Sequence, residues 1–165
     1  MPKNTDIYLR NIIFGISDSL VSTVGLLSGI DVSGTSRQVI ILTGVVYAFV
    51  EAFSMAVGSF LSEESAEEAA AGKEVSPAKP IVGGSVMFLS FILASFIPIL
   101  PYLVAGAASA LWISILLSIA ALFVVGLVSA AVIKVNLMKH ALLTALLGGS
   151  AIVIGVLVGK FVKAA

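Results

Sequence analysis

The chain has 165 residues, of which 59% are hydrophobic and 11% are charged, and its formal net charge is zero. Soluble domains carry about a quarter charged residues, so this composition and a mean hydropathy of +1.18 exclude a soluble globular protein and indicate one that lies mostly within a bilayer. The zero net charge argues against a nucleic-acid partner, and the absence of cysteine excludes disulfides and thiolate metal sites.

Apolar stretches follow one another along the chain, each close to the roughly twenty residues that a helix needs to cross a bilayer. We predict an all-α integral membrane protein in which five transmembrane helices form a single domain. The predicted spans are residues 11–30, 39–61, 80–100, 110–133 and 141–162. No separate short apolar region with a small-residue cleavage site precedes the first stretch, so we interpret it as a retained helix rather than a signal peptide.

The first predicted span carries an acid, Asp18, near its middle. A carboxylate at that depth is costly unless it is neutralised, hydrated or paired, so it indicates a functional site. Small and polar residues recur with it at steps of three or four, within roughly 80° of arc on one helix face: Gly15, Ser22, Gly25 and Gly29. Because small residues let another helix approach closely, we expect this stripe to pack against or bind something.

The second predicted span has a similar stripe, which contains an acid, Glu51, and the thioether of Met55 one turn later. The other members of this stripe are Gly44, Tyr47, Ser54, Gly58 and Ser62. Of the nine acids in the chain, only Asp18 and Glu51 lie inside apolar spans, and no Lys or Arg lies deep in any span. We therefore expect protonation, hydration or a bound cation to stabilise both carboxylates.

These side chains form a mixed set of possible metal ligands. The two carboxylates supply oxygen, Met55 supplies sulfur, and the hydroxyls of Ser22 and Ser54 complete the set. Thioether sulfur is a soft ligand, so such a set suits Fe²⁺ or Mn²⁺ better than a purely oxygen site would. We predict that Asp18 and Glu51 line a metal pathway with these three residues. The alternative is that both acids are protonated and only join helices, while Met55 fills space in the packing.

The polar segment 62–79 begins with good helix formers, so we expect the second helix to extend beyond the membrane until Gly72 and Pro77 stop it. Acids recur along this extension at i,i+4 spacing: Glu63, Glu64, Glu67 and Glu68. Like charges at that spacing destabilise a helix unless a cation lies between them. The pattern is compatible with a solvated acidic extension or with a cytoplasmic mouth that concentrates metal ions electrostatically.

The later spans give the orientation. Pro98 and Pro101 are predicted to end the third span, and Tyr102 and Trp112 to lie at the membrane surface beside the link to the fourth. Six basic residues lie on the side of the N-terminus: Lys3, Arg10, Lys73, Lys79, Lys134 and Lys139. Three lie on the other side: Arg37, Lys160 and Lys163. We expect a cell-membrane protein whose N-terminus is cytoplasmic and whose C-terminus lies outside.

Together, the first two spans resemble the vacuolar iron transporter family. Residues 15–23, Gly-Ile-Ser-Asp-Ser-Leu-Val-Ser-Thr, are similar to the family's first-helix pattern Gly-x-Asn-Asp-Gly-Leu-Val-Ser-Thr. Residues 51–62 resemble its second-helix pattern around Ser-Met-x-x-Gly. Asp18 and Met55 match the family's metal-path positions, whereas Glu51 stands where many members have Gly. The resemblance implies a homodimer with the first helix at its interface, which moves Fe²⁺ or Mn²⁺ out of the cytosol in exchange for protons.

The chain departs from the family pattern in three places. Ser17 and Ser19 replace the usual Asn and Gly around Asp18, and Ser59 replaces a common Glu. Plant-type members carry a long metal-binding domain between the second and third helices, where this chain has only the short acidic loop 62–79.

We therefore predict a proton-coupled divalent metal transporter that needs no cofactor besides the transported ion. The chain has no phosphate loop and no HExxH or GxSxG motif, so we do not expect an enzyme. A membrane scaffold that transports nothing, and whose polar stripes serve only to pack helices, is one alternative. A transporter of another cation, such as Ca²⁺ or Na⁺, is the other.

Overall fold

The computed structural model describes residues 3–164, and every element in that range is an α-helix. The helices are α1 (Lys3–Val32), α2 (Arg37–Ala71), α3 (Ala78–Val104), α4 (Ala107–Ile133) and α5 (Leu137–Ala164). All five are long and apolar enough to cross a membrane. The prediction of an all-α protein with five transmembrane helices is therefore confirmed.

The helices are longer than the predicted spans, because hydrophobicity marks only the apolar part of each one. The clearest case is α2, whose 35 residues measure about 52 Å at a rise of about 1.5 Å per residue, against a hydrocarbon core of about 30 Å. It ends at Gly72, which adopts the left-handed conformation with φ 65° and donates its N–H to the Glu68 carbonyl at 2.8 Å. The predicted extension beyond the apolar span and its stop at Gly72 are confirmed.

The predicted end of the third helix is wrong. Pro98 and Pro101 are buried inside α3, which continues to Val104. Prolines are tolerated inside transmembrane helices, and the Ser114 hydroxyl of α4 donates to the Pro98 carbonyl at 2.8 Å, a bond that ties this part of α3 to α4. Tyr102, in the last turn of α3, is only 2% exposed, and its backbone carbonyl accepts a hydrogen bond from the Arg37 side chain at 2.5 Å.

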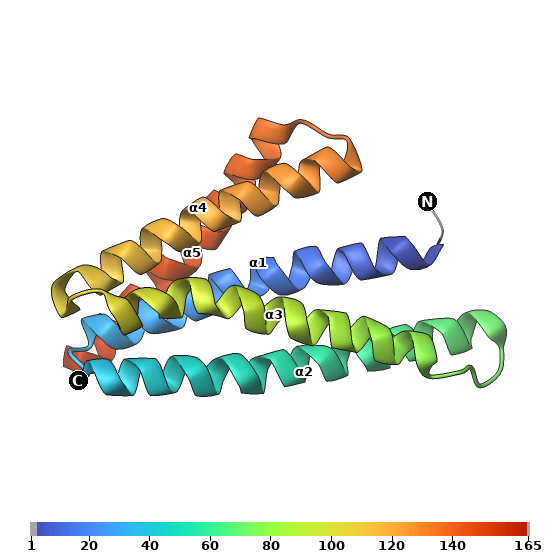
Figure 1. Cartoon of the computed structure of the whole chain (residues 1–165), viewed down its shortest axis with the longest axis horizontal. Coiled ribbons are helices and arrows are strands. Elements are labelled where there is room, and N and C mark those ends of the chain that lie inside the picture. The colour runs from blue at the N-terminus through green and yellow to red at the C-terminus, as the bar shows by residue number, and fades with distance from the viewer. Residues whose placement is uncertain (1–2, 165) are drawn as a thin grey trace.

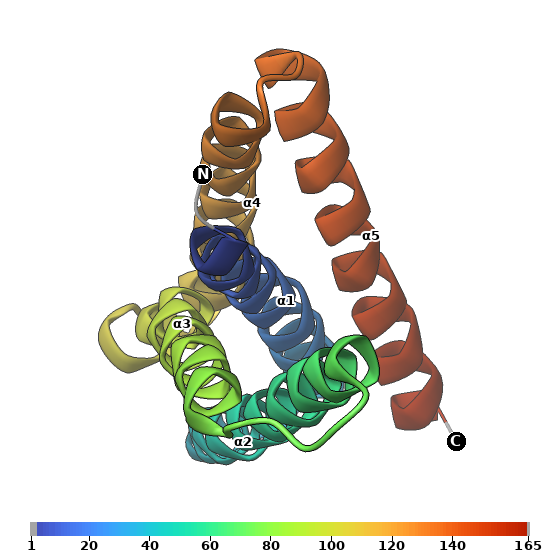
Figure 2. The same ribbon diagram turned by 90° about the vertical axis from the view of Figure 1, so that its right-hand side faces the viewer.

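The arrangement places α1 in the middle of the molecule. It packs against each of the other helices, while α2 pairs with α3 and α4 pairs with α5. Figure 2 shows α1 between these two pairs, and Figure 1 shows α1 beginning at one end of the bundle and α5 ending at the other. Within residues 3–164, α2 and α5 make no substantial contact, so part of α1 between them is left uncovered. The acid in α1 therefore lies half-buried on the central helix.

Glycines set the distance between α1 and α5. A Cβ at Gly155 would collide with the Gly25 carbonyl oxygen, and a Cβ at Gly159 would collide with the Gly29 carbonyl oxygen. Close approach at Gly25 and Gly29 was predicted, and in this structure their partner is α5 of the same chain. Gly15, on the same stripe, instead packs against Met87 of α3. The stripe thus contacts different helices at its two ends.

Candidate functional site

Asp18 is half-buried near the middle of α1 and lines a cavity of about 290 Å³ between α1, α4 and α5. The wall of this cavity is mostly apolar, and Ser17 and Thr144 are its other polar members. In the part of the chain that the structure describes, no basic nitrogen lies within 4.0 Å of the carboxylate oxygens of Asp18 or Glu51. The expectation that neither acid has a salt-bridge partner is confirmed for residues 3–164.

The polar stripes of α1 and α2 meet beside Asp18. Glu51 is half-buried and lies within electrostatic range of Asp18, so the two carboxylates repel each other when both are charged. The Tyr47 hydroxyl lies beside the Ser22 side chain and feels the charge of both acids. Ser22 donates its own proton to the backbone carbonyl of Asp18 at 2.7 Å, which leaves its oxygen lone pairs free to accept.

Tyr47 was not among the predicted ligands, although its place on the second stripe was a usable signal. Tyr47 is one turn before Glu51 on that stripe and both are half-buried, whereas Ser54, Gly58 and Ser62 further along it are exposed. Its phenol can donate a hydrogen bond to a neighbouring oxygen, which a purely apolar neighbour could not do. The side chains that meet here are therefore two acids and two hydroxyls, drawn from two helices.

Ser54 and Met55 open into a different cavity, of about 570 Å³, between α1, α2 and α3. The structure therefore divides the predicted ligands, because Asp18 does not line this cavity. Glu51 lies one turn before Met55 on α2 and within electrostatic range of Asp18, so it stands between the two groups. Phe14 lines both cavities.

A buried amide joins three helices at the end of this larger cavity. The side-chain nitrogen of Asn11 donates to the Ser59 hydroxyl at 2.9 Å and to the Gly83 carbonyl at 3.1 Å. Asn11 is only 3% exposed, so these bonds link α1, α2 and α3 away from solvent. Sequence reasoning passed over Asn11 because it stands at the boundary of the first apolar span, where a polar residue is expected.

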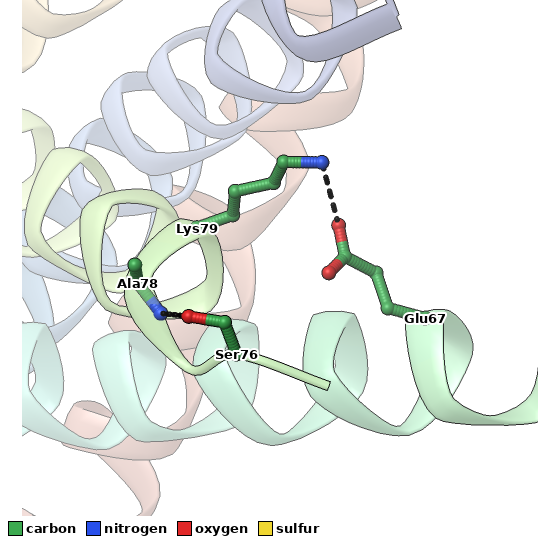
Figure 3. A network of polar contacts seen from close by, with 4 residues as sticks. All are labelled: Glu67, Ser76, Ala78 and Lys79. Atoms are coloured by element: carbon green, nitrogen blue, oxygen red, sulfur yellow. Dashed lines mark hydrogen bonds and ion pairs between the residues drawn. The ribbon is translucent and has the colours of Figure 1, made fainter. Parts of the chain in front are cut away.

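The acids of the α2 extension are not a row of exposed carboxylates. Glu63 is only 6% exposed, and its Oε2 lies against Gly83, where a Cβ would collide with it. Glu67 pairs with Lys79 at 3.6 Å (Figure 3), while Glu64 and Glu68 are half-buried. Burial raises the pKa of Glu63 and the nearby Glu67 charge raises it further, while the positive charges of Arg10 and Lys79 oppose that rise.

The α2–α3 turn is held by local contacts. Figure 3 shows the Glu67–Lys79 pair together with the Ser76 hydroxyl, which accepts a hydrogen bond from the Ala78 N–H at 3.5 Å as α3 begins. Lys79 is largely exposed, so this ion pair contributes little to stability. The turn is thus a short structured connection between two helices.

The described residues contain no group of three or more His, Cys, Asp or Glu side chains that could hold a metal ion. Carboxylates alone therefore do not form a complete metal site within residues 3–164. An ion near Asp18 and Glu51 would need further ligands, and the hydroxyl and thioether groups of the neighbouring stripes are the nearest candidates by chemical type.

A family model described as the VIT family matches residues 9–76 and residues 68–160 of the chain. The two matches together reach from α1 to α5, and they overlap at the end of α2 and the turn that follows it. Among curated proteins, no match to the chain was found.

Proposed function

Because the chain belongs to the VIT family, the vacuolar iron transporter family, we propose that this membrane metal-ion transporter moves Fe²⁺ or Mn²⁺ out of the cytosol in exchange for protons. The observation that carries the proposal is that Asp18 and Glu51 are half-buried within electrostatic range of each other, with no basic partner among the described side chains. In a medium of low dielectric two such carboxylates repel each other unless protons or a cation neutralise them.

The exchange of ions follows from charge. One divalent cation neutralises the charge of two carboxylates. In its absence, protons bound to the carboxylates can neutralise them instead. Entry of the metal ion then releases protons, since a carboxylate must be deprotonated to act as a ligand. Asp18 and Glu51 would bind the metal ion, and the hydroxyls of Ser22 and Tyr47 would orient it or donate hydrogen bonds to the acids.

In this proposal the ion reaches these acids through the cavity between α1, α2 and α3, which neither acid lines. The cavity begins near Arg10 and Ser62, at the end of the bundle that carries the α2–α3 turn, and it reaches Met55 one turn from Glu51. That end is the cytoplasmic one by the distribution of Lys and Arg. The thioether of Met55 discriminates against Mg²⁺ and Ca²⁺, which prefer oxygen ligands.

A second copy of the chain completes the proposal. The part of α1 between α2 and α5 is uncovered in the single chain, and a half-buried acid lies along it. In a homodimer with α1 at the interface, two Asp18 side chains would approach each other and share the ion. This arrangement is the one that the family resemblance implies.

Transport by the purified protein in proteoliposomes with a pH gradient tests the proposal. We expect Fe²⁺ or Mn²⁺ flux that follows the proton gradient, and we expect Asp18→Asn and Glu51→Gln to abolish it. Glu74→Gln is the matched control, because it removes one negative charge from the exposed α2–α3 turn and should leave flux unchanged.

The same variants separate transport from a purely structural role. A scaffold whose acids only join helices would lose dimer assembly in Asp18→Asn, whereas a transporter would lose flux while still forming dimers. Flux that is unchanged in Asp18→Asn would refute the role proposed for this acid.

A further inference from the structure

Two methionine side chains line the cavity between α1, α2 and α3. Met55 reaches it from α2 and Met87 reaches it from α3. Met87 is only 4% exposed and lies on neither of the polar stripes that the sequence marks. The cavity is thus bounded by a second thioether, contributed by a helix to which sequence reasoning had assigned no ligand.

Gly15 makes room for this second sulfur. A Cβ at Gly15 would lie 3.2 Å from the sulfur of Met87 and 3.1 Å from the Cβ of Ser90, closer than ordinary van der Waals contact. The absence of a side chain at Gly15 therefore lets the Met87 sulfur rest directly against α1, one turn before Asp18. Glycine at this position does more than allow two helices to approach, because it places a soft atom beside the helix that carries the acid.

The rest of the wall contributes polar groups. The hydroxyls of Ser54 and Ser59 and the amide of Asn11 all line the cavity. Hydroxyl and amide oxygens alone favour hard cations, and two thioether sulfurs shift the preference toward softer ones. Arg10 lines the same cavity, and its positive charge weakens the binding of a cation. A transported ion must bind weakly enough to leave its site.

We propose that Met87 is a second sulfur ligand on the metal path, which with Met55 holds a borderline or soft divalent ion on its way to Asp18 and Glu51. Met87 is then a specificity-determining residue, since its sulfur favours such ions over Mg²⁺ and Ca²⁺. The inference rests on the proposed function, because it takes this cavity as the route of the transported ion. The competing role for Met87 is packing against Gly15 alone.

Nuclear magnetic resonance of the purified full-length protein, labelled with ¹³C at the methionine methyl groups, tests the inference directly. The chain has four methionines, so each resonance can be assigned by a single substitution. Cd²⁺ is the probe, because it is soft and diamagnetic. We expect the Met55 and Met87 resonances to shift together and to saturate at the same Cd²⁺ concentration, while Met138, 57% exposed in the first turn of α5, stays unchanged.

A binding measurement with variants complements the spectra. Met87→Leu keeps the side-chain volume and removes the sulfur, and losing a supporting contact at a metal site costs about 10- to 100-fold in affinity. We expect Met87→Leu to weaken Cd²⁺ binding by at least about tenfold while leaving Mg²⁺ binding unchanged. Met138→Leu is the matched control and should bind both ions as the unmodified protein does.

The outcomes distinguish this inference from the function on which it rests. A shift of the Met55 resonance without one of Met87, with normal Cd²⁺ binding by Met87→Leu, would show that Met87 only packs, and the proposed function would stand. If neither resonance responds to Cd²⁺, the sulfur ligands assigned in both proposals are wrong. The spectra of the unmodified protein decide between these outcomes even if Met87→Leu folds poorly.

Discussion

At the scale of single residues, the protein keeps polar side chains in two different circumstances. Asp18 and Glu51 are half-buried, repel each other and have no basic partner among the described residues. The side-chain nitrogen of Asn11 donates two hydrogen bonds that cross to other helices. A satisfied buried amide stabilises a fold, whereas acids without partners cost stability and are retained where they serve a function.

The role of Asn11 leads to a prediction about stability. Asn11→Ala removes the donor from Ser59 and from the Gly83 carbonyl, and an unsatisfied buried group costs about 1–3 kcal/mol. We expect the thermal unfolding temperature of the purified protein in detergent to fall. The control is Ser85→Ala, since the exposed Ser85 hydroxyl bonds only to the Ile81 carbonyl of its own helix. Equal unfolding temperatures for the two variants would contradict this account.

At the scale of helices, α1 is shaped to fit different neighbours along its length. Gly15 accommodates the sulfur of Met87 on α3, and the glycines further along allow contact between the backbones of α1 and α5. Without a hydrophobic driving force between helices in lipid, such close packing is a main source of attraction between them. The acid between these two contacts is consequently held on a helix that is anchored on both sides.

The contact between α1 and α5 gives a prediction with a control on the same helix. In Gly155→Ala the new methyl group meets the backbone of α1, which cannot rotate away, so overpacking should cost about 1–3 kcal/mol. In Gly149→Ala the new methyl group has no heavy atom within 4 Å, and the better helix former should stabilise the protein by up to about 1 kcal/mol. Thermal unfolding of both variants measures the difference, and equal values would refute the contact.

At the scale of the whole molecule, the single chain leaves the central helix partly uncovered. The pairs α2–α3 and α4–α5 stand on either side of α1, with no substantial contact between α2 and α5 in the described part of the chain. Phe14 is 51% exposed along this helix, and Asp18 follows it one turn later. A carboxylate that faces lipid has a high free-energy cost, so we expect a second copy of the chain to cover Asp18.

Cross-linking tests this assembly, and the absence of cysteine from the chain makes an introduced thiol unique. We expect Phe14→Cys and Ser22→Cys to give covalent dimers on oxidation in membranes, because a disulfide forms only where the two Cα atoms lie within about 7 Å. Leu93→Cys, 68% exposed on α3, is the control and should stay monomeric. Dimers of Leu93→Cys without dimers of the α1 variants would place the interface elsewhere.

The sequence by itself determined the helices, the two polar stripes, the unpaired acids and the family resemblance. These features are local, since the length and period of an apolar stretch depend only on residues close together in the chain. The extension of α2 to Gly72 was predictable for the same reason. The end of α3 was not, because Pro98 and Pro101 are buried inside the bundle, and no local pattern announces that packing.

Only the tertiary structure decided which side chains meet. It divided Asp18 and Met55 between two cavities, added Met87 and Asn11 to the larger one, and buried Glu63 against Gly83. Each outcome depends on how far a helix is rotated about its axis and how closely it approaches its neighbours. Packing between segments far apart in the sequence sets both quantities, and the pattern within one helix does not contain them.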